Sequence, residues 1–207
     1  MGKVTSGFSM SLDGFVAGPH DGPEQPMGEG GDRLFEWYFT GDASVEIPSG
    51  NRLFKMTEDG AELVRSASQA AGVLVTGRRT FDLAGAWGGQ HPMNVPVVVV
   101  THRVPQEWVK EGSPFTFVTD GVESAIARAQ AIAGDKDVTV GGPSIVKQCL
   151  TAGLLEEIHI DLIPVLLGAG VRLFEPIGVR PVDLEILDVN PMPGVTHLTY
   201  RVIKSGR

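Results

Sequence analysis

The chain has 207 residues, of which 42% are hydrophobic and 20% charged, and these ordinary values predict one soluble globular domain over residues 1–207. The formal net charge of −8 argues against nucleic acid as a partner, and no apolar run is long enough to span a membrane. The single cysteine, Cys149, excludes an intramolecular disulfide and, with no secretory signal at the N-terminus, indicates a cytoplasmic protein in which this side chain lies in the core.

The N-terminal quarter predicts a strand and then a long irregular excursion. Residues 3–10 alternate well enough to form the strand, and Asp13-Gly14 is a strong turn signal. Residues 18–55 lose this pattern and are rich in glycine and proline, as functional lids and mobile segments often are. Within them, residues 32–39 resemble a short helix with Asp32 as its N-cap. Its aromatic side chains form either a small satellite core or a wall for a flat ring ligand.

Beyond residue 56, helical and strand patterns alternate. The predicted helices cover residues 57–71, 80–84, 122–133 and 143–152, the last with Gly153 just beyond its end. The predicted strands cover residues 72–76, 95–101, 115–118, about 138–140 and about 156–164, followed by an antiparallel pair at 182–189 and 196–203. This order predicts an α/β fold with a mixed, mostly parallel sheet, helices on both faces and an antiparallel C-terminal edge.

Ligands of such sheets bind beyond the carboxyl ends of the strands, and three of these ends carry useful residues. They are residues 77–80, 101–103 and 141–145. Gly141-Gly142 lets the backbone turn sharply and approach a ligand without a Cβ in the way. Pro143 suits the first position of a helix, whose N-terminus can hold a phosphate.

The first two of these ends supply groups that a phosphate monoester needs. Arg78, Arg79 and Arg103 carry guanidinium forks, and Thr80 and Thr101 add hydroxyls. With a second phosphate group at the paired glycines, the pattern suits NADP rather than NAD. The alternative is a solvated arginine surface that binds no ligand.

Five short motifs, in register along the chain, resemble those of the dihydrofolate reductase fold. They are Ser11-Leu-Asp-Gly14, Gly77-Arg-Arg-Thr-Phe81, Val99-Val-Thr-His-Arg103, Val140-Gly-Gly-Pro-Ser144 and Ile163-Pro-Val-Leu-Leu-Gly-Ala-Gly170. The first and last look most like the reductase domain of the bifunctional deaminase-reductases of riboflavin synthesis, which has stand-alone relatives. The resemblance covers nearly the whole chain except residues 18–55. It implies a three-layer α-β-α domain, NADPH as the hydride donor and a homodimer.

The resemblance also implies contacts to NADPH, residue by residue. The group around the adenosine 2′-phosphate would be Gly77, Arg78, Arg79, Thr80, Thr101, His102 and Arg103. The cradle of the pyrophosphate and nicotinamide side would be Gly141, Gly142, Pro143, Ser144 and Ile145. Val16 and Ala17 would lie along the nicotinamide edge, and the nicotinamide would face a cleft closed by residues 18–55.

Three carboxylates are candidate catalytic residues. Dihydrofolate reductases use an acid on their first long helix, where Asp59 and Glu62 are the nearest matches here. A carboxylate that faces the cleft would bind a pterin-like amidine edge and relay a proton. The alternative for both is an ordinary exposed helical acid. Asp13 is the third candidate, unless its turn is only structural.

The substrate contacts fall in the least alignable part of the chain. The riboflavin-pathway domain acts on a ribosylaminopyrimidine phosphate, for which Arg33, Arg52 and Lys55 offer basic groups, and Trp87 is a further candidate contact. No metal site is predicted, because scattered histidines and one cysteine cannot build the zinc site of a deaminase. The sequence therefore predicts a reductase domain alone.

Two functions from different classes follow. The first is an NADPH-dependent reductase of a small pyrimidine- or pterin-like substrate, similar to 5-amino-6-(5-phosphoribosylamino)uracil reductase or to dihydrofolate reductase. The second is an NADP(H)-binding protein without turnover, such as a sensor or binding module. An acid beside the nicotinamide and a cleft open to a second ring favour the reductase. A cleft filled by Phe35, Trp37 or Trp87 favours the binding module.

Overall fold

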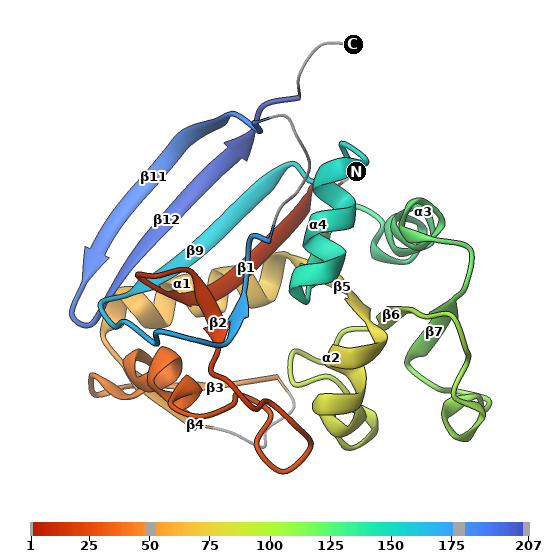
Figure 1. Cartoon of the computed structure of the whole chain (residues 1–207), viewed down its shortest axis with the longest axis horizontal. Coiled ribbons are helices and arrows are strands. Elements are labelled where there is room, and N and C mark those ends of the chain that lie inside the picture. The colour runs from red at the N-terminus through yellow and green to blue at the C-terminus, as the bar shows by residue number, and fades with distance from the viewer. Residues whose placement is uncertain (1, 49–52, 176–180, 205–207) are drawn as a thin grey trace.

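The computed structural model describes residues 2–48, 53–175 and 181–204 and is built around one large sheet (Figure 1). Its eight strands lie in the order β11-β12-β9-β1-β8-β5-β6-β7. Their bounds are Val4–Ser11 (β1), Ala71–Gly77 (β5), Val97–Val100 (β6), Phe115–Val118 (β7), Asp137–Gly141 (β8), Glu157–Ile163 (β9), Leu184–Met192 (β11) and Val195–Val202 (β12). The strands from β9 to β7 run parallel, whereas β12 and β11 are antiparallel additions at one edge. The predicted mixed sheet is confirmed.

The helices cover both faces of this sheet. They are α1 (Glu58–Ala70), α2 (Arg78–Leu83), α3 (Val122–Ala133) and α4 (Pro143–Thr151). The connections through α1 and α2 advance along the sheet toward β7, whereas those through α3 and α4 return toward β9. Because parallel crossovers are right-handed, the two pairs lie on opposite faces. Figure 1 shows α4 in front of the sheet and α1 behind it, which confirms the three-layer arrangement.

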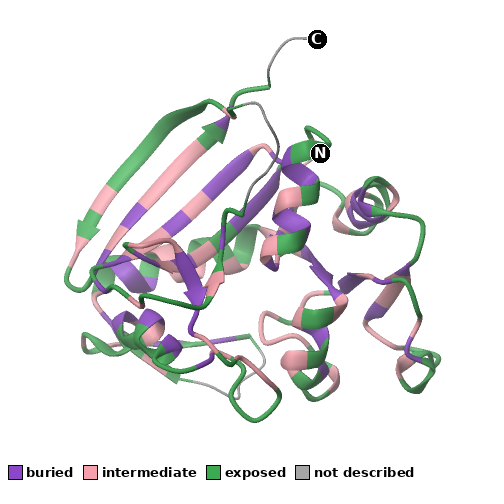
Figure 2. Ribbon diagram, in the orientation of Figure 1, coloured by how far each residue is buried: buried purple, intermediate pink, exposed green. Residues whose placement is uncertain are grey.

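The two faces of the central strands differ in chemistry. Successive side chains of a strand point to opposite faces, so one face is set by alternate residues. The face under α3 and α4 belongs to the main core and carries Val4, Val138, Val140, Ile158, Ile160 and Val202. The positions between them carry Thr5, Ser9, Thr139, Glu157, His159, Asp161, His197 and Thr199. Figure 2 shows the central strands striped by this alternation, while β11 is exposed along most of its length. The sheet thus presents a polar surface toward α1.

The excursion after residue 17 is more ordered than its composition suggests. It contains a 3₁₀ helix, η1 (Gly31–Phe39), and a hairpin of β3 (Ala43–Glu46) and β4 (Leu53–Met56). Leu34 and Trp37 are buried in a second cluster with Ala61 of α1, so the predicted satellite core is confirmed. The prediction that Asp32 caps the helix is wrong, because the N-cap is Gly30 and Asp32 lies in the first turn.

Several local predictions are confirmed and others need correction. Thr57 caps α1 by accepting a hydrogen bond from the Gly60 amide (3.2 Å), and Gly153 follows α4 with a φ of +67°. Cys149 is buried in the main core, as expected. Strand β11 runs on through Pro191, which the sequence assigned to the connection. An edge strand tolerates this proline because one side of its backbone has no partner strand.

Two further short strands pair with each other outside the large sheet. Phe15–Ala17 (β2) pairs antiparallel with Val171–Arg172 (β10). Within the described ranges, every helix is too short or too polar to cross a membrane.

Candidate functional site

A cleft of about 1220 Å³ lies between the polar face of the sheet and α1. Gly60 and Ala61 are the only residues of α1 that are buried. Small residues of this helix, such as Ala67 and Ala70, line the cleft and leave space between the helix and the sheet. Residues of η1 and β4 border the same space, as expected of the excursion. Small-molecule sites typically measure roughly 300–1,000 Å³, so this cleft has room for a cofactor end and a second ring.

The three predicted strand ends are neighbours in space, and those at residues 77–80 and 141–145 reach one end of this cleft, whereas residues 101–103 are not among its lining. In the sheet, Thr76 of β5 pairs with Gly141 of β8, and Gly77 pairs with Val100 of β6. The Arg78 guanidinium donates from Nη1 to the Arg103 carbonyl over 2.9 Å, which links the turns after β5 and β6. The sequence motifs that suggested a phosphate site are therefore neighbours in space.

The three arginines of this region differ in whether a carboxylate pairs with their guanidinium. Arg78 donates from Nε to both carboxylate oxygens of Asp82 (2.7 and 2.9 Å), and Arg79 donates to Asp21 Oδ1 (2.8 Å). The guanidinium of Arg103 has no partner among the described residues, while its backbone amide donates to the Thr101 hydroxyl (3.2 Å). His102 is exposed beside it. Arg103 is thus the side chain that is most available to an incoming phosphate.

The glycine turn before α4 forms a cradle that a side chain would fill. Gly142 has a φ of +88°, and a Cβ there would lie 2.7 Å from the Thr80 hydroxyl. Thr76 Oγ1 is buried, has no hydrogen-bond partner within the described chain and would lie 3.7 Å from that same Cβ. An unpaired buried hydroxyl and a cradle that a Cβ would fill, at the N-terminus of a nine-residue helix, fit a phosphate-containing cofactor.

The predicted cofactor residues do not all reach the cleft. Those that line it are Val16, Ala17, Arg79, Thr80, Gly142 and Pro143. Ser144 is exposed at the start of α4, whereas the Ile145 side chain is buried in the main core, where it lies against Gly77. Any contact of Ile145 with a cofactor would therefore come from its backbone.

The predicted catalytic acids also differ in placement. Asp59 and Glu62 are exposed on α1 and line the cleft, with Glu62 3.8 Å from the Arg65 guanidinium. Asp13 is not among the lining residues. Its carboxylate accepts hydrogen bonds from the Ser11 hydroxyl (2.6 Å) and from the backbone amides of Leu167 (3.1 Å) and Gly168 (2.7 Å). This arrangement makes Asp13 an anchor for the loop that follows β9, and its catalytic role stays a prediction.

The predicted substrate contacts receive little support from the geometry. Trp87 packs edge-on against Phe81 (6.2 Å) and His91 (4.9 Å) and does not itself line the cleft, although His91 does. Burial lowers the pKa of His91 to about 4. Arg52 lies outside the described residues. Arg33 and Lys55 are exposed and are not among the residues that line the cleft.

Asp13→Asn is expected to reduce the loss of stability in acid. The hydrogen bond from Ser11, supported by the two backbone amides, lowers the pKa of Asp13 in the folded state. The ionised carboxylate therefore stabilises the fold above the unfolded value of about 3.9, and this contribution is lost as the pH falls through the lower folded value. Thermal unfolding at a series of pH values should show a shallower decline below about pH 4 for the variant. Asp42→Asn, at an exposed carboxylate, should follow the wild type, and parallel curves for all three proteins would contradict the assignment.

Sequence reasoning missed a buried pair on the polar face of the sheet. His197 of β12 stands opposite Asp161 of β9, and its Nδ1 lies 2.7 Å from Asp161 Oδ1. The Asp161 carboxylate also accepts a long hydrogen bond from the Ser9 hydroxyl (3.5 Å), which itself accepts from Trp37 Nε1 (3.2 Å). All four residues line the cleft. The signal was present as polar residues at every second position of a strand that is otherwise apolar.

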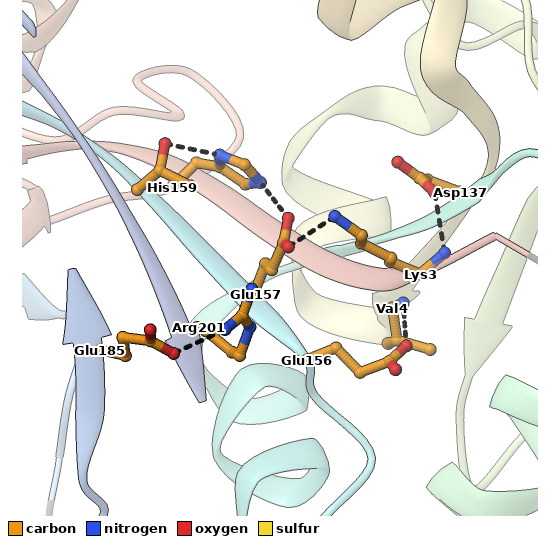
Figure 3. Close-up of polar contacts among 9 residues, drawn as sticks. Lys3, Val4, Asp137, Glu156, Glu157, His159, Glu185 and Arg201 are labelled. Carbon is orange, nitrogen blue, oxygen red and sulfur yellow. Dashed lines mark hydrogen bonds and ion pairs between the residues drawn. The ribbon is translucent and has the colours of Figure 1, made fainter. Parts of the chain in front are cut away.

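A second polar group occupies the same face nearer the start of β9 (Figure 3). Glu157 is buried and pairs with Lys3 Nζ at 2.6 Å and with His159 Nε2 at 3.8 Å. Burial lowers the pKa of His159. The Asp137 carboxylate accepts from the Lys3 backbone amide (2.8 Å). These contacts form a satisfied network, in contrast to the pair formed by Asp161 and His197.

The described residues hold no group of three histidines, cysteines or acids that could bind a metal ion. Comparison with protein families finds that residues 2–198 match the model of the RibD C-terminal domain. A search of curated proteins found no match.

Solved structures with the same fold include three informative neighbours. A protein from Shewanella sp. PV-4 described as a riboflavin biosynthesis protein has a TM-score of 0.69 at 21% identity, over 98% of this chain and 99% of its own. Dihydrofolate reductase from Enterococcus faecalis, complexed with NADP(H) and RAB-propyl, has a TM-score of 0.57 at 16% identity, over 98% and 97%. A deaminase/5-amino-6-(5-phosphoribosylamino)uracil reductase from Thermotoga maritima has a TM-score of 0.59 at 12% identity, over 98% of this chain but 57% of its own. At these identities the likeness establishes the dihydrofolate reductase-like fold.

Proposed function

The chain belongs to the family of RibD C-terminal domains, and we propose that it is an NADPH-dependent reductase of a pyrimidine- or pterin-like substrate. The observation that carries the proposal is the continuity of the cleft. One space joins the turn at Gly142, where a phosphate-containing cofactor fits, to a polar and aromatic region with room for a second ring. The fold neighbour from Enterococcus faecalis, which is complexed with NADP(H), supports the cofactor.

The residues of the cofactor half would bind and orient NADPH. Arg103, with Arg78 beside it, would pair with the 2′-phosphate, and the turn at Gly142 with the Thr80 hydroxyl would hold the pyrophosphate. Val16 and Ala17 would align the nicotinamide edge. When bound, the cofactor supplies the hydride, and the contribution of the chain is alignment and exclusion of water.

The substrate half would hold the ring of the substrate, with the carbon that accepts the hydride beside the nicotinamide. Its walls include Phe35, Trp37 and Tyr38 of η1, and its floor is the polar face of β1, β9 and β12. Asp59 and Glu62 of α1 border the space from the other side and stay candidates for the proton donor. The two substrate types of the proposal are a ribosylaminopyrimidine phosphate and a reduced pterin.

The second function, NADP(H) binding without turnover, is less consistent with the geometry. Phe35 and Trp37 lie at the border of a cleft of about 1220 Å³ rather than filling it, and Trp87 packs elsewhere. Acidic groups line the space beside the expected nicotinamide position. An open, acid-lined space beside a hydride donor is what reduction requires and what a sensor has no need of.

A homodimer and a cytoplasmic location are also part of the proposal. The exposed apolar side chains of β11, which include Leu184, Ile186 and Val189, support the first by giving the sheet edge a surface that a second copy could cover. A single, buried cysteine is compatible with the second.

The reductase is tested by incubating the protein with NADPH and a panel of rings while following the loss of NADPH absorbance. The panel contains 5-amino-6-(5-phosphoribosylamino)uracil, its dephosphorylated riboside and dihydropterin. The expected result is oxidation of NADPH that depends on one of these compounds, with a product two hydrogens heavier than that compound by mass spectrometry. Tight binding of NADPH with no turnover of any ring would favour the binding module.

Arg103→Ala is expected to weaken the binding of NADPH by about 10–100-fold and to leave that of NADH unchanged. The reason is that a charge-assisted hydrogen bond to a phosphate contributes about 1.5–3 kcal/mol and NADH lacks the 2′-phosphate. Calorimetric titration of both nucleotides measures the difference. The matched control is Arg128→Ala on α3, a surface arginine on the other face that pairs with Asp120 at 3.5 Å. Equal losses for NADPH and NADH would contradict the assignment of Arg103.

A further inference from the structure

The charges of the cleft are strongly one-sided. Among the described residues, six acidic side chains line it: Asp21, Asp59, Glu62, Asp137, Glu157 and Asp161. Arg79 is the one lysine or arginine of that lining, and it is already engaged by Asp21 at 2.8 Å. A phosphate group on the substrate would therefore meet repulsion in this part of the cleft, whereas an uncharged or cationic ring that presents N–H donors would be attracted.

Most of these acids are either engaged by a partner or exposed to solvent. Glu157 is held by Lys3 and His159, and Asp137 by the Lys3 backbone amide (Figure 3). Glu62 is 77% exposed and Asp59 is exposed too, so solvent screens both. The side chain of Asp161, by contrast, is 22% exposed and sits on the floor of the cleft.

Aromatic rings line the cleft together with Asp161 and contact the residues that hold it. Trp37 stacks on Tyr38 with centroids 4.1 Å apart, and it contacts His197 edge-on at 5.0 Å. Burial, reinforced by the charge of Asp161, raises the pKa of Tyr38 well above its ordinary range. Flat rings of this kind form a stacking wall, and a carboxylate at their base would set the orientation of a flat ligand.

The hydrogen-bonding capacity of Asp161 is only partly used. A carboxylate offers about four lone-pair sites, of which His197 takes one and Ser9 takes another at the long distance of 3.5 Å. Because the Asp161 carboxylate is the acceptor of this hydrogen bond, Nδ1 of His197 must carry the proton that is donated. His197 Nε2 is buried and has no partner in the described chain. The imidazole thus fixes one oxygen of Asp161 and leaves the other for a ligand.

We propose that Asp161 is the residue that selects the substrate ring, by accepting hydrogen bonds from adjacent N–H groups of an unphosphorylated 2-aminopyrimidine or pterin, and that His197 and Ser9 position its carboxylate. The proposal rests on the proposed function, because it takes the ring to lie in the cleft beside NADPH. It moves the ring-binding acid from α1, where the resemblance implies it, to the floor of the sheet on β9.

The test compares two rings on the protein saturated with NADP+. Pterin has the 2-amino group, and pteridin-4-one is the same ring system without it. Calorimetry should find that the wild type binds pterin about tenfold or more tightly than pteridin-4-one, the effect of one charge-assisted hydrogen bond. Asp161→Asn should remove this difference, because the uncharged amide would keep its oxygen on His197 and present an NH₂ donor to the N–H donors of the ring. Glu62→Gln and Asp59→Asn, at the two exposed acids of α1, should keep it.

The role of His197 is tested by a pair of variants. In His197→Asn the side-chain amide can still donate to Asp161 from the position of Nδ1, so the preference for pterin should be largely retained. His197→Leu keeps the bulk but has no donor, and it should reduce the preference about as much as Asp161→Asn does. Equal preferences in the two variants would show that His197 only fills space.

Three results would overturn the proposal. The first is equal affinity of the wild type for pterin and pteridin-4-one, including no measurable binding of either. The second is an unchanged preference for pterin in Asp161→Asn. The third is tighter binding of 5-amino-6-(5-phosphoribosylamino)uracil than of its dephosphorylated riboside. The affinity of each variant for NADP+ reports that its fold is intact. Failure of the wild type to bind NADP+ would instead remove the proposed function, so the two failures are distinguishable.

Discussion

Gly142→Ala is expected to weaken NADPH binding by about 10–100-fold, because the loss of a phosphate cradle removes charge-assisted hydrogen bonds of about 1.5–3 kcal/mol. The φ of Gly142 is +88°, where a Cβ is strained, and that Cβ would lie 2.7 Å from the Thr80 hydroxyl. The turn before α4 must therefore shift, and with it the backbone groups that face the cofactor. Calorimetric titration with NADPH measures the loss.

Gly134→Ala is the matched control for this substitution. Gly134 follows α3 with a φ of +63°, and a Cβ there would meet nothing within 4 Å. Both variants should lose about 1–3 kcal/mol of stability through backbone strain. Only the change at Gly142 should affect the nucleotide, and similar NADPH affinities for the two variants would contradict a cofactor site at this turn.

Phe81→Ala is expected to lower the free energy of unfolding by about 3–5 kcal/mol. Phe81 of α2 is 1% exposed and meets Trp108, Phe115 and Phe117 edge-on at 5.9, 5.1 and 5.6 Å. In a domain of this size, each kcal/mol of lost unfolding free energy lowers the midpoint of thermal unfolding by about 2–4 °C. The midpoint of the variant should therefore fall by about 6–20 °C. The same cluster holds α2 against the sheet, and NADPH affinity should fall as well.

Phe39→Ala provides the comparison for Phe81. Phe39 ends η1 and is 63% exposed, so its loss should change stability by less than about 0.5 kcal/mol. A small effect at both positions would mean that the aromatic cluster around Phe81 does not hold α2 in place.

The sequence patterns were sufficient for the sheet and for the convergence of the strand ends at which we propose that the cofactor binds. Apolar runs located β5, β6 and β8, and the order of elements then fixed a parallel sheet. Because parallel strands end at one edge, the residues after them had to converge, and Arg78 does contact Arg103. These inferences rest on local patterns and on topology, which a single sequence carries.

The substrate half depends on a pairing that local patterns do not reveal. Asp161 and His197 lie in different strands and meet only because β12 pairs antiparallel with β9 in one particular register. A shift of that register by one residue would turn His197 to the other face of the sheet. A lone histidine in a C-terminal strand is usually a core residue, and nothing in its own neighbours indicated the carboxylate.

The excursion was hard to predict for a related reason. The four-residue strands of the β3–β4 hairpin are too short for a clear alternation, and η1 takes its stability from the burial of Leu34 and Trp37 rather than from helix propensity. Glycine and proline content correctly marked the segment as unusual. This composition did not indicate that the segment folds onto α1, whereas its place beside the cleft was implied by the family resemblance.

Side-by-side titration of the wild-type protein with NADPH and NADH, at low and moderate salt, tests the central claim most directly. The account predicts that NADPH binds about tenfold or more tightly than NADH, and that the difference narrows as salt screens the exposed arginines. Equal affinities would contradict the phosphate pocket at Arg103. Absence of binding by both nucleotides would contradict the cofactor assignment itself, and with it the reductase.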